Sequence, residues 1–240
     1  MTAPAAIFQV GHLERVPLGT PYPGIVARVG RLLEQLPART ELVIDITGVG
    51  KPVFEMFTHA GISPLGVLIT AGTTETREGA ICSVPKLTLV SRLQALLHEG
   101  RLKIHKELPE AETLVRELQD FRVEFTAAGH LTFNARSGKH DDLVLALAIA
   151  VWRAHGGGMA NWGLYEYYRQ RAMGPEASEP HYFVGVDLGQ SRDPTAIVVV
   201  RRVDPPRPVP EDEKPKPNYA PGSLEWQEEQ LHRKNQPSPG

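Results

Sequence analysis

The stretch of sequence that decides the fold lies near the end of the chain, at Tyr182–Val200, and reads YFVGVDLGQSRDPTAIVVV. Two apolar runs flank a short polar turn, a pattern that is typical of two antiparallel strands. The first run carries a single carboxylate, Asp187, between apolar neighbours. An aspartate on a buried strand destabilises the fold unless it is paired, hydrogen-bonded or bound to a cation. We therefore interpret Asp187 as a functional residue.

The segments before this hairpin alternate between strands and helices. Apolar runs predict strands at Ile7–Pro17, Glu41–Asp45 and Leu65–Thr70, whereas apolar residues at helical spacing predict helices at Ile25–Leu36 and around Val53–Ala60. Strands and helices that alternate in this way indicate a layered α/β domain with some parallel strand pairing.

The middle of the chain continues the pattern after one polar interruption. Ala71–Lys86 is polar and contains glycine, so we predict a mobile surface loop there. Helices are expected at Leu87–Gly100 and Glu110–Asp120, and a hairpin at Arg122–Ala135. A pair of aspartates, Asp141–Asp142, then precedes a strongly apolar helix.

Composition narrows the class of protein. The chain has 240 residues, 41% of them hydrophobic, and a formal net charge of −2, so no overall basic field indicates a nucleic-acid partner. Cys82 is the only cysteine, which excludes an internal disulfide and a cysteine-cluster zinc site. The sequence contains no apolar run long enough to span a bilayer. We expect a soluble, intracellular protein without a membrane partner.

The same patterns divide the chain into four parts. We expect residues 1–155 to form the main body and residues 156–181 to form a linker with a short helix. We expect residues 182–203 to form the strand hairpin that completes the sheet. Residues 204–240 are too rich in proline and charge to build a core, and we expect them to be extended or disordered.

Three more carboxylates lie at the edges of apolar elements, namely Asp45, Asp141 and Asp142. Taken singly, each has a structural explanation, because aspartate commonly caps turns and helix N-termini. Together with Asp187 they could converge on Mg²⁺ or Mn²⁺, which prefer oxygen ligands. Two such ions about 3.5–4 Å apart activate a water and stabilise the leaving oxygen in phosphodiester cleavage.

Three segments with these carboxylates resemble the acidic motifs of the carboxy-terminal nuclease domain of phage terminase large subunits. They are FVGVDLGQSRDPTAIVVV, LVIDITGVGKPVFEMF and RSGKHDDLVLALAIA. The resemblance implies a ribonuclease H-like fold, in which helices flank a mixed sheet. It also implies a metal-dependent endonuclease that uses two Mg²⁺ or Mn²⁺ ions to cut double-stranded DNA during viral packaging. Its expected partners are a separate packaging ATPase, a small terminase or a portal protein, in the cytoplasm of a bacterial host.

The resemblance also assigns roles to individual residues. Asp187, Asp45 and Asp142 match the metal ligands of the family, and Asp141 is an auxiliary catalytic candidate beside them. Further candidates are Asp193 next to the ligands, His140 as a phosphate contact or water-positioning group, and Lys139 and Lys86 as contacts to DNA phosphates.

Two features depart from the family pattern. The chain shows no motif for the packaging ATPase that usually precedes this domain. The strand with Asp187 and its hairpin partner normally begin the domain, but here they come last. We interpret this as a circular permutation with the break between the second and third strands, because loops at strand ends tolerate such cuts. A strand exchanged between two molecules, or a fusion during genome rearrangement, remains an alternative.

Other functions stay open from the sequence. A Holliday-junction resolvase or transposase of the same fold class would use similar carboxylates on a different DNA shape. A catalytically inactive DNA-binding scaffold would fit the near-neutral charge. The segment VDLGQS also resembles a phosphate-binding turn of actin-like nucleotide binders, although that fold needs a second phosphate motif and a longer chain.

Overall fold

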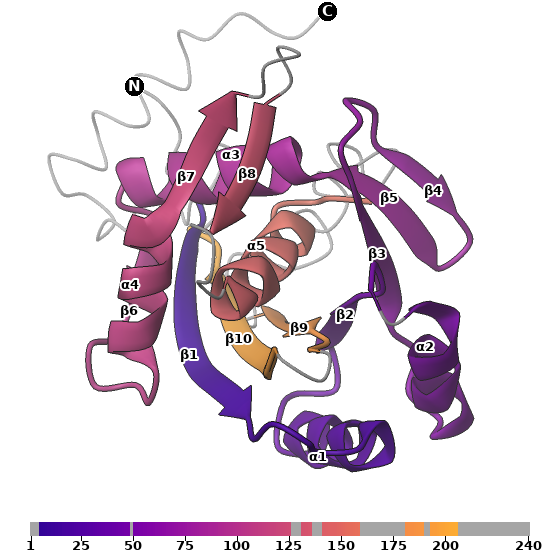
Figure 1. The fold of residues 1–240 in the computed structure, drawn as a ribbon. Helices are drawn as coiled ribbons and strands as arrows, with labels where there is room; N and C mark the ends of the chain where they lie inside the picture. Colours follow the sequence, from indigo (N-terminus) through magenta and orange to yellow (C-terminus); the bar gives the residue numbers. More distant parts are fainter. Residues whose placement is uncertain are drawn as a thin grey trace, which may run out of the picture. The chain divides into compact units, whose positions relative to one another are not determined.

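The core of the fold is a mixed β-sheet. The structure is a computed structural model, which describes residues 5–48, 50–125, 131–135, 141–158, 181–189 and 193–205. Eight strands form this sheet in the order β4-β5-β3-β2-β9-β10-β1-β6, and β7 and β8 pair separately (Figure 1). The strands are β1 (Ile7–Val16), β2 (Glu41–Asp45), β3 (Leu65–Thr70), β4 (Thr76–Glu78), β5 (Ile81–Pro85), β6 (Leu102–Ile104), β7 (Phe121–Phe125), β8 (Leu131–Ala135), β9 (His181–Asp187) and β10 (Thr195–Val203). The helices are α1 (Tyr22–Glu34), α2 (Gly50–His59), α3 (Lys86–His98), α4 (Ala111–Asp120) and α5 (Asp142–Ala154).

The hairpin that comes last in the described sequence lies in the middle of the large sheet. β9 and β10 pair antiparallel with each other, β9 pairs parallel with β2, and β10 pairs antiparallel with β1. Most residues of both strands are buried. Strands covered on both faces are near-continuous apolar runs, which accounts for the sequences that flank Asp187. The circular permutation itself stays a prediction.

Helices cover both faces of this sheet. One hydrophobic cluster joins α3, α4 and α5 to inward residues such as Val43, Phe183 and Ala196. The other joins α1 and α2 to the alternate residues of the same strands, for example Ile44 and Val184. Every residue of α5 is buried, so this helix lies inside the domain rather than on its surface (Figure 1).

The prediction of a mobile loop at Ala71–Lys86 is wrong. β5 lies in this segment and pairs parallel with β3, and β4 pairs antiparallel with β5. Cys82 and Val84 of β5 are fully buried. The polar, glycine-containing residues before Ile81 dominate the composition of this segment, whereas β5 itself is short and mostly apolar and pairs with the edge of β3. Tertiary pairing of this kind overrides local propensity.

Two predicted segments lie largely outside the described residues. They are most of the expected linker 156–181 and nearly all of the expected tail 204–240. Within the part that is described, no helix is both long and apolar enough to pass through a membrane.

Candidate active site

Two of the predicted ligands stand side by side on neighbouring strands. Asp45 and Asp187 are the last residues of β2 and β9, which run parallel, and they are directly paired in the register of these strands. Residues paired in this way project to the same face of a sheet. On the other side of Asp187, the same row continues through Ala196 of β10 to Arg15 of β1. Strand register therefore places two carboxylates and one guanidinium on a single line across the sheet.

The other two predicted carboxylates come from the start of α5, which packs on this same face. Asp142 is the first residue of the helix and is buried, and Asp141 is the N-cap residue before it and is half-buried. An Arg15 guanidinium nitrogen, Nη2, donates to Asp142 Oδ2 at 3.3 Å, and Lys86 Nζ donates to Asp141 Oδ2 at 3.3 Å. Arg15 and Lys86 thus partly neutralise the carboxylates of the helix.

The local structure after β2 explains how Asp45 is held. Its Oδ1 accepts hydrogen bonds from the backbone N–H of Thr47, at 2.8 Å, and from the Thr47 hydroxyl. The hydroxyl oxygen in turn accepts the N–H of Ile69 in β3, at 2.8 Å. The turn-capping explanation of Asp45 is therefore correct for one oxygen, and it fixes the carboxyl group beside Asp187.

Burial and like charge raise the pKa of both strand carboxylates. For Asp187 the main cause is desolvation, followed by the charges of Asp45, Asp142 and Asp141, and the pKa is raised well above its ordinary value. For Asp45, desolvation outweighs the hydrogen bonds of Thr47, which lower its pKa. Asp187 is therefore close enough to the other three carboxylates to be repelled by their charge.

The chemistry of these donors fits a hard divalent cation. A cation among crowded carboxylates would favour their charged forms, which burial and mutual repulsion disfavour. In the described residues, however, no three His, Cys, Asp or Glu side chains are already grouped so that they could hold a metal ion. Asp142 and Asp141 contact Arg15 and Lys86 instead. The carboxylates nearest to one another that could hold a cation are those of Asp45, Asp187 and Asp142.

Two residues of this site were not found by sequence reasoning. Arg15 lies in a strand with several other polar residues, and nothing in the sequence distinguishes it. Glu117 of α4 is buried, and its Oε2 accepts the backbone N–H groups of Leu143 and Val144. The available signal was its spacing, because Glu117 follows buried Ala111 and Leu114 on the inward face of the helix.

The remaining predicted residues lie around this centre or outside the described part. Lys86 begins α3 and contacts Asp141, whereas Asp193 is exposed in the turn before β10. His140 and Lys139 lie outside the described residues.

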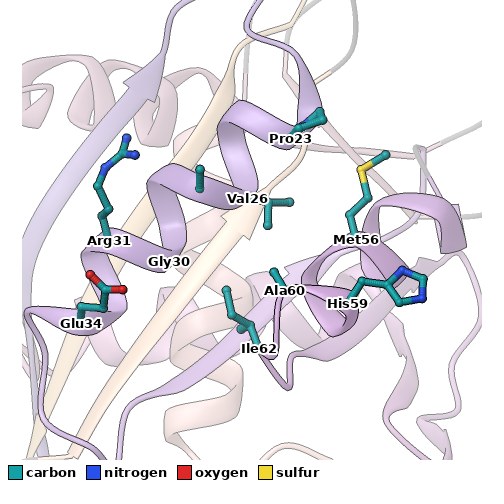
Figure 2. Close-up of a pocket in the computed structure, with 10 residues that line it drawn as sticks. Pro23, Val26, Gly30, Arg31, Glu34, Met56, His59, Ala60 and Ile62 are labelled. Carbon is teal, nitrogen blue, oxygen red and sulfur yellow. The ribbon is translucent and has the colours of Figure 1, made fainter.

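A hollow on the opposite face of the sheet is a different feature. It has a cavity volume of about 590 Å³ and lies between α1 and α2, with Val26, Met56 and Ile62 among its lining residues (Figure 2). Arg31, Glu34 and His59 extend from its rim. The four carboxylates lie on the other face, so this hollow is separate from the candidate active site.

Comparison with known proteins decides the family. The model of the terminase RNase H-like domain matches residues 24–153, which is more than half of the chain. The chain belongs to the terminase RNase H-like domain family. The predicted family and the predicted α/β, ribonuclease H-like fold are confirmed.

Two curated relatives are similar to part of this RNase H-like chain. The terminase large subunit of Thermus phage G20c is 28% identical over 141 residues, which cover 59% of this chain and 26% of the relative. The terminase large subunit of Thermus virus P23-45 is 29% identical over 125 residues, which cover 52% and 22%. The match thus spans about a quarter of the length of each relative. No solved structure matches significantly.

The extent of the family match is informative about the site. It includes Asp45, Asp141 and Asp142 but ends before β9. The family match therefore does not cover Asp187, and the inclusion of Asp187 in the candidate site rests on its strand pairing with Asp45.

Proposed function

We propose that the chain is a divalent-metal-dependent DNA endonuclease that cleaves phosphodiester bonds during phage DNA packaging. The observation that carries this proposal is the direct pairing of Asp45 with Asp187 beneath the start of α5, where Asp142 stands. Membership of the terminase RNase H-like family supports it. The domain would consist of residues 1–155 together with residues 182–203.

Each side chain of the site has a proposed role. Asp45, Asp187 and Asp142 would hold Mg²⁺ or Mn²⁺, and Asp141 would assist them. Two bound ions would supply an activated water and stabilisation of the leaving oxygen. Lys86 offers a positive charge beside the carboxylates and would also attract a DNA phosphate. Lys139 remains a predicted phosphate contact, and His140 a predicted phosphate contact or water-positioning group. Asp193 remains a predicted neighbour of the ligands.

The proposed setting of this activity follows from the relatives, which are named terminase large subunits. The substrate would be double-stranded DNA in a bacterial cell that carries the phage or prophage. A packaging ATPase, a small terminase or a portal protein would act with this domain.

Cleavage of a supercoiled plasmid tests the proposal. With Mg²⁺ or Mn²⁺ we expect nicked and linear products, and with EDTA we expect none. Asp45→Asn should slow nicking by about a hundred-fold or more, because loss of a metal ligand removes several kcal/mol of transition-state stabilisation. Gel densitometry over time measures the rates.

The matched control is Glu55→Gln, which neutralises an exposed carboxylate on α2 and should cleave like the wild type. Intact plasmid under every condition would contradict the proposal and favour an inactive DNA-binding scaffold. Faster cleavage of a four-way junction than of linear duplex would indicate a resolvase instead.

A further inference from the structure

The first turn of α5 is capped by another helix. Asp141 occupies the N-cap position, with φ −130°, but its side chain makes no capping hydrogen bond. An N-cap aspartate usually accepts the N–H groups of the second or third helical residue. Here these N–H groups, of Leu143 and Val144, donate to Oε2 of Glu117 in α4, at 3.0 and 3.2 Å. Glu117 therefore performs the capping that Asp141 does not.

This arrangement has a consequence for the aspartate pair. Because Glu117 satisfies the helix terminus, the carboxylates of Asp141 and Asp142 can point elsewhere. Asp141 contacts Lys86, and Asp142 contacts Arg15. The capping explanation that the sequence offers for both aspartates thus does not describe the side chain of Asp141.

The setting of Glu117 is unusual for a residue that only stabilises a helix. The side chain is 7% exposed, and its second oxygen, Oε1, has no hydrogen-bond partner among the described residues. The positive end of the α5 dipole favours a carboxylate there. Desolvation and the charge of Asp142 oppose it and raise the pKa of Glu117 to about 7, whereas Arg15 favours the charged form. A buried carboxyl group is thus retained close enough to Asp142 and Arg15 to feel the charge of both.

We propose that Glu117 is a positioning residue, which keeps Asp142 and Asp141 near Asp45 and Asp187 by holding the first turn of α5. The inference rests on the proposed function, in which these carboxylates share a divalent cation. Without the cap, the first turn would fray, since helix ends without partners for their N–H groups are weakly held. Asp142 would then lose its fixed direction.

Two substitutions distinguish the effect of the hydrogen-bond acceptor of Glu117 from the effect of the size of its side chain. Glu117→Gln keeps an oxygen that can accept both N–H groups, whereas Glu117→Met keeps the length and apolar volume but removes the acceptor. We expect Glu117→Met to weaken Mn²⁺ binding by about 10- to 100-fold, the range typical of residues that orient metal ligands. Glu117→Gln should keep the affinity for Mn²⁺ within a few-fold of that of the wild type.

The measurement is a titration of the full chain with Mn²⁺, followed by electron paramagnetic resonance of the free ion, with plasmid nicking in parallel. Val29→Ala, a cavity substitution at a fully buried position of α1 on the opposite face, controls for lost stability alone. It should lower the unfolding midpoint but leave Mn²⁺ affinity unchanged. If Glu117→Met does not fold, Glu117→Asp, which withdraws the acceptor by one methylene, replaces it with the same expectation.

The outcomes distinguish this inference from the proposed function. Equal Mn²⁺ affinity in wild type and Glu117→Met would overturn the positioning role and leave the nuclease proposal standing. Mn²⁺ binding without DNA cleavage would overturn the nuclease proposal, and the affinities of the variants would still decide the role of Glu117. Absence of Mn²⁺ binding to the wild type would overturn both.

Discussion

Asparagine in place of Asp187 is expected to abolish DNA cleavage and to raise the thermal unfolding midpoint of the metal-free protein at pH 8. The carboxylate is crowded by Asp45, Asp142 and Asp141 and is desolvated, so its charged form is disfavoured in the fold. A neutral side chain of the same shape removes this repulsion. A gain of a few degrees is expected, since about 1 kcal/mol moves the midpoint of a domain of this size by roughly 2–4 °C.

The stability gain from Asp187→Asn should depend on pH in a defined direction. The fold raises the pKa of Asp187, so the folded protein binds this proton more tightly than the unfolded chain does. The carboxyl group therefore contributes stability below its ordinary pKa of 3.8, and this contribution is lost as the pH rises through the raised pKa. The difference in midpoint between variant and wild type should be small near pH 4 and should grow toward pH 8.

Thermal unfolding in EDTA, followed by circular dichroism at several pH values, measures this effect. Glu55→Gln, at an exposed position, should show no comparable trend. Addition of Mn²⁺ should stabilise the wild type but not Asp187→Asn, because only a ligand that binds the folded state raises its stability. A lower midpoint for Asp187→Asn at pH 8 would show that the carboxylate is held by favourable contacts, contrary to the proposed cation site.

Alanine at Gly185 is expected to damage stability and activity together. A Cβ atom there would lie 2.0 Å from the carbonyl oxygen of Ala146 and 2.9 Å from Cβ of Ala150, both in α5. Since backbone cannot yield as a flexible side chain can, the whole helix must move off the sheet. Overpacking of this kind destabilises by about 1–3 kcal/mol, occasionally more. Because Asp142 stands at the start of the displaced helix, plasmid cleavage should fall as well.

Gly11→Ala in β1 is the matched control, because nothing lies within 4 Å of a Cβ atom at that position. Its free energy of unfolding should stay within about 0.5 kcal/mol of the wild type, as for most surface substitutions. Urea unfolding measures both variants. Equal stability of Gly185→Ala and Gly11→Ala would contradict the close contact between α5 and β9.

Sequence reasoning was most accurate where the information is local. The strand pair around Asp187, the apolar helix after Asp141–Asp142 and the strand that ends at Asp45 were all predicted, and each is present in the structure. Periodicity and turn residues report on local conformation, and carboxylates at the ends of apolar runs are visible one by one. The motifs around them also sufficed to predict the family, which the comparison confirms.

What only the tertiary structure decided is which of these elements become neighbours. β5 was not predicted from the sequence because it is stabilised by pairing with β3. Glu117 was not predicted because its role depends on a contact between α4 and α5. The sequence alone determined that four carboxylates lie at the edges of apolar elements. The pairing of Asp45 with Asp187, and the approach of Arg15 to Asp142, follow from strand register and helix packing. These depend on contacts between residues far apart in the chain, which no local pattern encodes.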